Sequence, residues 1–419
     1  MLASLDGGVE PTPRIRTPVG APMRNYRLDG ALILATDFSR PDPDGSGISR
    51  RLTRRLRTEI RARGWIGFER FMERALYEPE LGYYNNASTK FGPLGDFVTA
   101  PELSPVLAGA LAARFADHLR PFDDPVVLEV GAGTGQLAVD LARALRARDI
   151  RARYWILEPS PELRNRQRQR CAAAGIETRW LDEFPHEPFD GAIIANEVLD
   201  AFPTTCFVKR AGEVRPLGVG WAEKDFTWME GPADAELSGY IASLEKRLGR
   251  RLADGYRSEV SRQLPSWMRR VATALHCGAV YVLDYGLTET DYYHPQRAHG
   301  TLICHYRHRA HDNPFHLPGL QDISAWVDFS ACARAARQAG LTVEGFTTQG
   351  HFLVESGMKP EARTQPGAQT QTGTADPAAA QALKTLVLPG EMGERFKLLV
   401  LSRGMTLDPP PGRDFRARL

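Results

Sequence analysis

The sequence predicts an α/β fold built on a mainly parallel sheet with helices on both faces, and three observations predict it. Short apolar runs rich in β-branched and aromatic residues alternate with stretches of helical periodicity. The run 126–145 passes from a buried strand pattern, through glycines, to a 3.6-residue period. The chain has 419 residues, 42% of them hydrophobic and 25% charged, which suffices for a large core. Strands that alternate with helices are joined by crossovers, so their sheet is mainly parallel.

The N-terminal part divides into a tail and a helical segment. Residues 1–47 are rich in Gly, Pro, Asp and Arg, so we expect a loose tail. From Ile48, apolar residues recur at every fourth position among arginines, and the helical pattern continues through 66–84. We therefore assign 48–100 to an N-terminal helical segment that ends in a glycine-flanked loop.

The core is expected at 101–221 and 268–405, interrupted by 222–267, whose charged helical pattern predicts an inserted helical subdomain. Residues 360–382 are of low complexity and predict a flexible loop within the core. After the first strand, the apolar runs that predict strands are 154–159, 191–198, 279–286, 352–356 and 396–403.

Charge and cysteine usage exclude several classes of protein. The net charge is +2, and 7 of the 53 basic residues are lysine, a skew towards arginine that reflects codon usage rather than a nucleic-acid surface. We expect no nucleic-acid partner. No apolar run approaches the roughly 18 residues that a membrane span needs. Five cysteines without a close pair, and no signal-peptide pattern at the start, predict a cytoplasmic protein.

A glycine motif follows the first core strand. Glu129 precedes Gly131, Gly133 and Gly135, and glycines allow the backbone to approach a ligand closely. The helix that follows directs its N-terminal N–H groups at an anion. A dinucleotide fingerprint requires its third glycine at 136, where this chain has glutamine. The spacing therefore favours S-adenosylmethionine over NAD, with the carboxylate of the cofactor as the anion.

Further candidate cofactor residues lie at other turns. Glu158 ends the second strand, where a carboxylate can accept both ribose hydroxyls, and Asp182 follows the third strand, where it can meet the adenine amino group. The alternative for both is an ordinary solvated turn acid. The loop 91–105 precedes the core and could fold over the cofactor, although it could also be a surface turn. Its candidate cofactor residues are Gly95, Asp96, Phe97 and Thr99.

The stretch NEVLDAFP, residues 196–203, ends the fourth strand at the edge of the sheet where ligands bind in open α/β folds. Methyl transfer requires a nucleophile held in line and the removal of its proton. Asn196, Glu197 and Asp200 are therefore candidate catalytic residues, and paired carboxylates also suit a guanidinium. The alternative for Asn196 and Asp200 is capping of the next helix.

The stretch CHYRHRAHDNPF, residues 304–315, contains three histidines but favours no metal site. An extended chain points His305 and His308 to opposite faces, and no partner at metal-ligand spacing accompanies them. We expect a loop that lines a site, with His308 as a candidate catalytic residue; a buried network of structural histidines is the alternative. The candidate substrate-binding residues are Tyr306, Arg307 and His311.

Taken in order, the motifs resemble those of the MidA family of S-adenosylmethionine-dependent methyltransferases over about residues 48–404. The resemblance rests on ALYEPELGYY, GDFVTAPELSP, LEVGAGTGQL, NEVLDAFP, LDYG, GTLICHYRHRAHDNPF, PGLQDISAWVDF and LPGEMGERFKLLVL. It implies a Rossmann-like class I methyltransferase fold with added N-terminal and inserted helices. It also implies that Gly95 and its neighbours, 129–135 and Glu158 surround the cofactor, with Asn196 and Glu197 at the methyl-transfer edge.

Mitochondrial members of that family assist the assembly of respiratory NADH dehydrogenase and symmetrically dimethylate an arginine of one of its subunits. The resemblance therefore implies a protein arginine N-methyltransferase that acts on a respiratory-complex subunit. Two rival functions stay open: an assembly protein that holds the cofactor as a structural ligand, and a methyltransferase for a small molecule.

Overall fold

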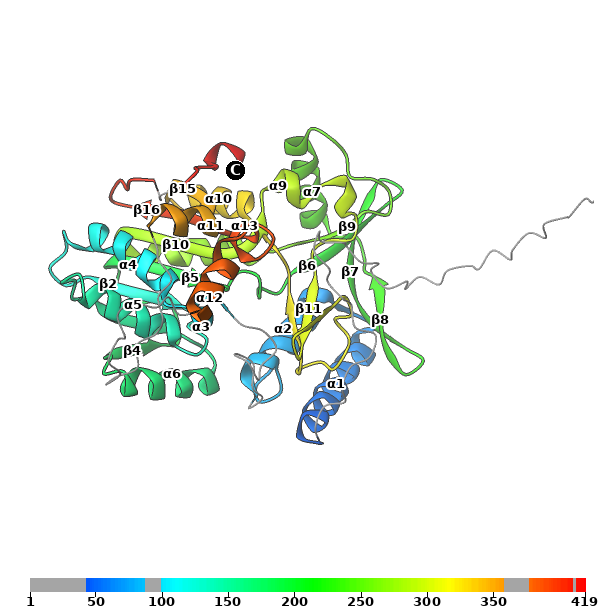
Figure 1. Ribbon diagram of the computed structural model, residues 1–419. Coiled ribbons are helices and arrows are strands. Elements are labelled where there is room, and N and C mark those ends of the chain that lie inside the picture. Colours follow the sequence, from blue (N-terminus) through cyan, green and yellow to red (C-terminus); the bar gives the residue numbers. More distant parts are fainter. Residues whose placement is uncertain (1–42, 87–98, 358–376, 410–411) are drawn as a thin grey trace, which may run out of the picture.

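The computed structural model describes residues 43–86, 99–357, 377–409 and 412–419. A large twisted sheet forms its centre, with strands in the order β4-β3-β2-β5-β10-β16-β15 (Figure 1). All pairings are parallel except those of β16, which runs antiparallel to both of its neighbours. The strands are β2 (Val126–Val130), β3 (Arg153–Leu157), β4 (Thr178–Leu181), β5 (Phe189–Asn196), β10 (Leu275–Leu287), β15 (Thr342–Thr348) and β16 (Phe396–Arg403), and short β14 (Val327–Asp328) pairs with β10. The predicted α/β class is confirmed.

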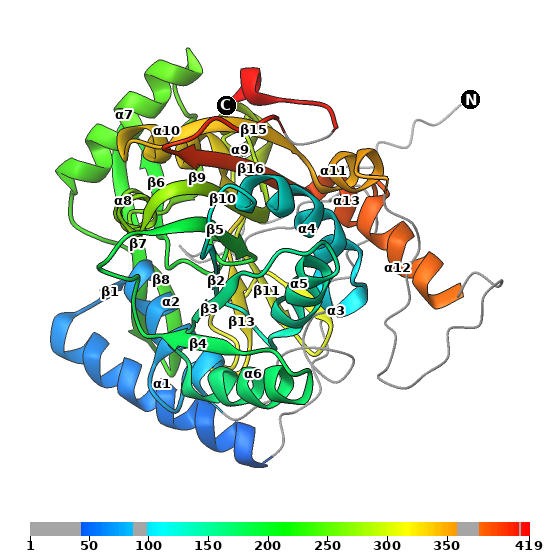
Figure 2. The ribbon, with the colours of Figure 1, turned by 90° about the vertical axis from the view of Figure 1, so that its left-hand side faces the viewer.

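Helices cover both faces of this sheet (Figure 2). Every residue of β2 is buried, as expected for a strand between two helical layers. One face carries α4 (Val106–Leu119), α5 (Gln136–Arg146), α6 (Pro161–Ala173), α11 (Gln349–Glu355) and α12 (Pro377–Val387). The opposite face carries α8 (Leu264–Ala274) and α10 (Phe329–Gln338). Short elements α3 (Ala100–Leu103), α13 (Met392–Arg395) and η3 (Arg416–Arg418) complete the core. Helix α9 (Glu289–Tyr292) and turn η2 (Pro295–Arg297) lie next to the apolar cluster of α7.

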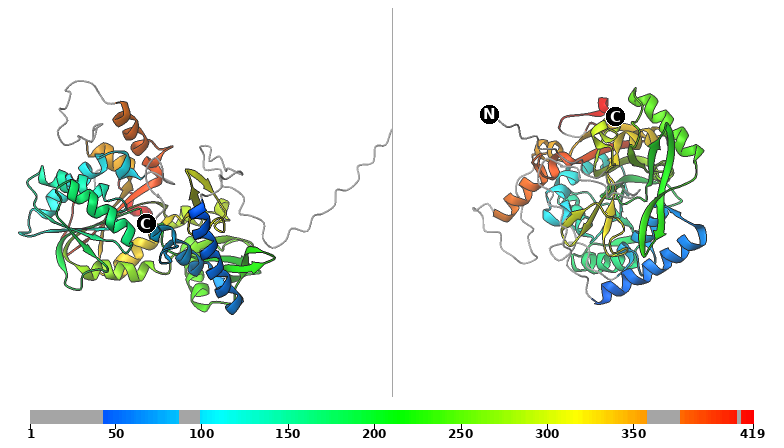
Figure 3. Two further views of the ribbon diagram at one scale, coloured as in Figure 1. Left: turned by 90° about the horizontal axis from the view of Figure 1, so that it is seen from below. Right: turned by 90° about the vertical axis from the view of Figure 1, so that its right-hand side faces the viewer.

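A second layer lies beside the core, as Figure 3 shows. It is an antiparallel sheet in the order β1-β7-β6-β9, with β8 added on β7. Its strands are β1 (Ile66–Gly67), β6 (Thr205–Arg210), β7 (Glu213–Ala222), β8 (Asp225–Glu230) and β9 (Arg257–Val260). The apolar side chains of α1 (Pro43–Arg63) and α2 (Phe68–Tyr77) pack on this sheet, and α7 (Ala235–Leu248) packs through a separate cluster. Turn η1 (Tyr83–Asn85) and the small sheet of β11 (Ile303–Tyr306), β12 (Arg309–His311) and β13 (Asp322–Ser324) complete this side.

Three segments differ from the prediction. Helix α1 begins at Pro43, inside the predicted tail 1–47. Residues 222–267 are not purely helical: they hold β8, α7 and β9, and the two strands pair antiparallel with β7 and β6 to extend their sheet. The predicted loop 360–382 lies outside the described residues up to 376, and from Pro377 the chain is helical.

A fourth difference concerns 352–356, predicted as a strand and found within helix α11. The Thr348 side chain caps this helix by accepting the N–H of His351 at 3.2 Å, while Phe352 and Leu353 are buried against the sheet. A short apolar run is compatible with a strand or a helix, and the N-cap bond of Thr348 stabilises the helix.

Two glycines allow the central strands to approach closely. Gly191 of β5 and Gly278 of β10 are register partners, with φ of +152° and +149°. A Cβ on Gly191 would lie 1.9 Å from the carbonyl oxygen of Val126, and one on Gly278 would lie 1.9 Å from that of Gly191. These glycines thus set the spacing of β2, β5 and β10, whose carboxyl ends carry the site.

None of the helices in the described part of the chain is sufficiently long and apolar to cross a lipid bilayer.

Candidate active site

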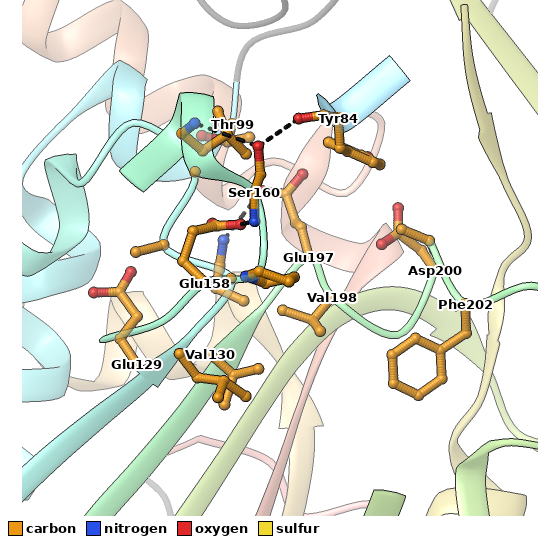
Figure 4. A pocket seen from close by; sticks show the side chains of 18 of the residues that line it. Tyr84, Thr99, Glu129, Val130, Glu158, Ser160, Glu197, Val198, Asp200 and Phe202 are labelled. Carbon is orange, nitrogen blue, oxygen red and sulfur yellow. Dashed lines mark hydrogen bonds between the residues drawn. The ribbon is translucent and has the colours of Figure 1, made fainter. Parts of the chain in front are cut away.

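A pocket of about 700 Å³ opens at the carboxyl ends of β2 and β5. At this point the strand order reverses direction, because β3 and β4 lie on one side of β2 and β5 and β10 lie on the other. Such switch points are where open α/β sheets bind ligands. Figure 4 shows side chains of both strand ends converging on this space.

The glycine turn after β2 lines one wall of the pocket. Gly131, Gly133 and Gly135 have φ of +66°, +52° and +81°, values that glycine adopts without strain. Gly135 is the N-cap of α5, so the first N–H groups of that helix face the pocket end of the turn. A Cβ on Gly131 would lie 3.1 Å from Cγ2 of Val198, so the turn packs closely against the loop after β5.

Two buried carboxyl groups lie behind this turn. Glu129 accepts a hydrogen bond from the hydroxyl of Tyr154 at 2.6 Å. Glu158 accepts the N–H of Ser160 at 2.9 Å on one oxygen and the amide of Gln167 at 3.0 Å on the other. Glu158 is only 3% exposed, which disagrees with the alternative of a solvated turn acid. Burial raises the pKa of each carboxyl to about 7.

The opposite wall is formed by the loop after β5. Glu197 has a positive φ of +54°, and its N–H donates to the carbonyl of Leu283 at 2.9 Å. Asn196 donates through its amide to Glu197 at 3.3 Å. In the view of Figure 4, Glu197 lies between Glu158 and Asp200. No helix follows this loop, since the next element is β6, so Asn196 and Asp200 do not act as helix caps.

Asp284, at the end of β10, holds this loop in place. One carboxylate oxygen accepts the N–H groups of Val198, Leu199 and Asp200 at 3.2, 2.9 and 3.2 Å. The other oxygen accepts the N–H of Tyr285 at 2.9 Å. The side chain is fully buried, so these bonds replace all of its water contacts. The loop that presents Glu197 is therefore anchored to the neighbouring strand.

The family described as "Putative S-adenosyl-L-methionine-dependent methyltransferase" matches residues 106–347. The chain belongs to this methyltransferase family. A Burkholderia thailandensis protein whose crystal structure holds S-adenosyl-homocysteine is 40% identical, with a TM-score of 0.80 over 89% of this chain and 97% of that chain. The resemblance to the MidA family is confirmed.

Curated relatives of the methyltransferase are more distant. The protein of Drosophila melanogaster named "Protein arginine methyltransferase NDUFAF7 homolog, mitochondrial" is 26% identical over 84% of this chain and 85% of its own length. The Mus musculus protein arginine methyltransferase NDUFAF7, also named as mitochondrial, is 24% identical over 84% of each chain.

The residues of the methyltransferase fit S-adenosylmethionine, which is its cofactor. The glycine turn presents bare backbone, and the start of α5 supplies N–H donors for a carboxylate. Each oxygen of Glu158 makes one hydrogen bond within the protein and keeps acceptor capacity for a ribose hydroxyl. Thr99 also lines the pocket, whereas the predicted cofactor residues Gly95, Asp96 and Phe97 lie outside the described residues.

Asp182 occupies a different environment from the other predicted cofactor acids. It lines the pocket, but its side chain is 89% exposed and forms an ion pair with Arg164 at 2.8 Å. Its contact with adenine stays a prediction.

The carboxyl groups of the loop after β5 repel one another. Burial, assisted by the charge of Asp200, raises the pKa of Glu197 to about 8. Burial and the charge of Asp322 raise the pKa of Asp200 to about 7. Burial, followed by the charges of Asp200 and Glu197, raises the pKa of Asp284. A cation bound among these groups would be stabilised and would lower their pKa values.

The histidine-rich stretch forms a hairpin of β11 and β12. Its two-residue turn is Arg307 and His308, both exposed and with φ of +49° and +60°, as in a type I′ turn. Tyr306 and His311 are buried and each packs edge-on against the ring of His316. None of the four predicted residues lines the pocket within the described part of the chain. Their catalytic and substrate-binding roles stay predictions, and the burial of His311 fits the structural alternative.

Within the described residues, no group of three or more potential ligands could hold a metal ion.

Sequence reasoning missed several pocket residues. His305, on the same hairpin, lines the pocket, as do Asp322 on β13 and Tyr285 on β10. All three lie within motifs of the family resemblance, which was the available signal. Tyr84 in η1 completes this side of the pocket by donating from its hydroxyl to Asp322 at 3.0 Å.

Proposed function

We propose that this methyltransferase transfers methyl groups to the guanidinium of an arginine in a protein. The observation that carries the proposal is the charge of the pocket. Among the described residues that line it, nine are Asp or Glu, against Arg270, Arg395 and His305. An arginine side chain is a long, permanently charged cation that such a pocket attracts.

Glu197 is the residue that orients the acceptor. It lies beside the glycine turn and its loop is anchored by Asp284, so its carboxylate is held where the cofactor and an acceptor meet. A carboxylate that accepts N–H groups of a guanidinium fixes the plane of that group. Asp200, on the same loop, accepts further N–H groups. Orientation of this kind supplies a large part of the rate in a displacement reaction.

The reaction releases one proton, because both the substrate and the methylated product are guanidinium cations. S-adenosylmethionine supplies a methyl group on a sulfonium, whose bond to sulfur breaks as the bond to nitrogen forms. A carboxylate with a raised pKa is the suitable acceptor for the proton, and burial gives Glu197 that property. Asn196 donates to Glu197 and so fixes the orientation of its carboxylate.

The acceptor is proposed to be a protein, and specifically a subunit of respiratory NADH dehydrogenase. Support for a protein arginine comes from the curated relatives, which are named as protein arginine methyltransferases. The choice of an NADH dehydrogenase subunit rests on the resemblance to the MidA family alone. Those relatives are named as mitochondrial, whereas the cysteine pattern here predicts a cytoplasmic location; all five cysteines are free thiols.

The test is transfer of a radiolabelled methyl group from S-adenosylmethionine to proteins of a respiratory-membrane extract, followed by acid hydrolysis. We expect label in methylarginine with the wild type, and a decrease of about 100-fold or more with Glu197→Gln, while the affinity for S-adenosylhomocysteine stays within about twofold. Glu187→Gln is the matched control, because it removes one exposed carboxylate that does not line the pocket.

The rival functions give different results. Label that appears only in small molecules would favour a metabolite methyltransferase. Tight cofactor binding without transfer to any acceptor would favour an assembly protein that uses the cofactor as a structural ligand. An unchanged rate for Glu197→Gln would remove the role assigned to Glu197.

A further inference from the structure

The end of the pocket beyond Glu197 is closed by a sheet that is not part of the methyltransferase core. Asp322, on β13 of the small sheet, faces the pocket with His305 from β11. Asp322 is only 3% exposed. A carboxylate buried at this depth requires hydrogen bonds or a cation to offset its loss of water.

Hydroxyl groups hold the carboxylates of this region in fixed orientations. Tyr84 donates to one oxygen of Asp322 at 3.0 Å, and Ser324 donates to the other at 2.6 Å. Tyr285 donates to one oxygen of Asp200. These bonds leave acceptor capacity on Asp322 and orient both groups from the side of the protein.

One polar atom here is buried without a partner. Oδ1 of Asp200 is inaccessible to water and has no hydrogen-bond partner among the residues that the structure describes, although the residue is 6% exposed and lines the pocket. Buried polar atoms are nearly always hydrogen-bonded, so this atom indicates a missing donor. The charge of Asp322 also raises the pKa of Asp200 and of Glu197, which places the three carboxyl groups in one electrostatic field.

Aromatic rings form the walls around these acids. Tyr84 stacks on Tyr77, with ring centroids 5.6 Å apart, and Trp326 meets Tyr285 edge-on at 6.3 Å. All four rings line the pocket. Aromatic faces and carboxylates together favour a flat, weakly hydrated cation, a description that fits a guanidinium better than an ammonium.

We propose that Asp322 acts together with Asp200 to hold the edge of the guanidinium that faces away from the methyl donor. This pair of carboxylates thereby selects arginine over lysine. The inference rests on the proposed function and deepens it. Glu197 engages the nitrogen that is methylated. The planar guanidinium has five N–H donors and reaches all three carboxylates at once, whereas the single ammonium of lysine reaches fewer.

The test is calorimetric titration of the complex with S-adenosylhomocysteine, using N-acetyl-arginine-N-methylamide and its lysine counterpart as probes. We expect the wild type to prefer the arginine probe. Asp322→Asn should lower the affinity for the arginine probe by about tenfold or more and reduce the preference for it over the lysine probe. The affinity for S-adenosylhomocysteine should stay within about twofold of that of the wild type. Glu187→Gln, which removes one exposed carboxylate that does not line the pocket, should leave the binding of both probes unchanged.

Equal binding of the arginine probe by Asp322→Asn and the wild type would overturn the inference. If Asp322→Asn does not fold, Tyr84→Phe removes the hydroxyl that orients Asp322 and keeps its charge; we expect about threefold weaker binding of the arginine probe, and no change would overturn the inference. Failure of the proposed function is distinguishable, because it would appear in the wild type as selective binding of the arginine probe without methyl transfer to any arginine.

Discussion

The two halves of the pocket are built in different ways. The cofactor half comes from one strand-turn-helix unit and the strand beside it, so Glu129, the glycine turn and Glu158 lie within 30 residues of one another in the sequence. The acceptor half brings together Tyr84, Asp200 and Asp322, and the bond from Tyr84 to Asp322 spans 238 residues. The first half depends on local geometry and the second on the packing of separate sheets.

This difference teaches where each function is encoded. A glycine turn between a strand and a helix creates an anion site, because backbone N–H groups bind the anion. The acceptor half relies on side chains, which reach the same place only when the second layer is docked on the core. Cofactor binding and acceptor recognition should therefore be separable by mutation.

The largest expected effect is a loss of cofactor binding, caused by a substitution in the cofactor half alone. Gly133→Val introduces a β-branched residue at a φ of +52° and fills the turn, so the affinity for S-adenosylhomocysteine should fall by about 100-fold, roughly 3 kcal/mol. Calorimetry measures this loss. The control is Gly340→Val, which has a similar positive φ of +83° but open space around it, and should retain cofactor binding. Normal binding by Gly133→Val would place the cofactor elsewhere.

The next effect lies at the junction of the two halves. Asp284→Asn turns an amide N–H₂ towards the N–H groups of the loop that carries Glu197, so kcat should fall by about 10- to 100-fold with little change in cofactor affinity. Steady-state kinetics measures kcat, and calorimetry measures the affinity for S-adenosylhomocysteine. An unchanged kcat would contradict the anchoring role assigned to Asp284.

Two substitutions on one hairpin test which of its histidines belongs to the acceptor half. His305 lines the pocket, with Nδ1 at 3.8 Å from Asp322, so His305→Ala should raise KM for the acceptor by about tenfold. His308 lies at the exposed tip, and His308→Ala should change KM and kcat by less than about threefold. Steady-state kinetics with one labelled acceptor compares them. The reverse order would restore the catalytic role predicted for His308 from the sequence.

The smallest effect concerns stability. Glu197 has a folded pKa of about 8, above the ordinary value of 4.5, so the folded state holds a proton that the unfolded state releases between these pH values. Stability is therefore lost as pH rises from about 4.5 to 8. Glu197→Gln removes this cost, and its melting temperature should exceed that of the wild type by about 2 °C at pH 9 but by little at pH 5. Thermal denaturation of both proteins without ligand measures these melting temperatures. Equal differences at pH 5 and pH 9 would contradict the prediction.

The cofactor half could be predicted from the sequence because its signal is local. The change of period at Gly131–Gly135 places a turn between a strand and a helix, and an acid directly after a strand, such as Glu158, falls at the same sheet edge. The spacing to Gln136 already favoured the correct cofactor. Glu197 was found in the same way, by its position after a buried strand.

The acceptor half could not be predicted in this way. Asp322 lies in a three-residue strand without recognisable periodicity, and its partners come from η1 and from the sheet edge. The histidines of the hairpin drew attention to His308, but the register of β11 turns His305 towards the pocket, and register is not visible in a four-residue strand. The strand predicted at 352–356 failed similarly, because a short apolar run does not distinguish the two kinds of element.

The close approach of β2, β5 and β10 at Gly191 and Gly278 has a consequence for mutational tolerance. Any side chain at either glycine would collide with a carbonyl of the next strand and push the strands apart. Gly191 lies on β5, six residues or about 20 Å before Glu197, which directly follows the end of that strand. In a saturation screen for activity, these two positions at the far end of the sheet should therefore be as intolerant of substitution as the residues that touch the substrate.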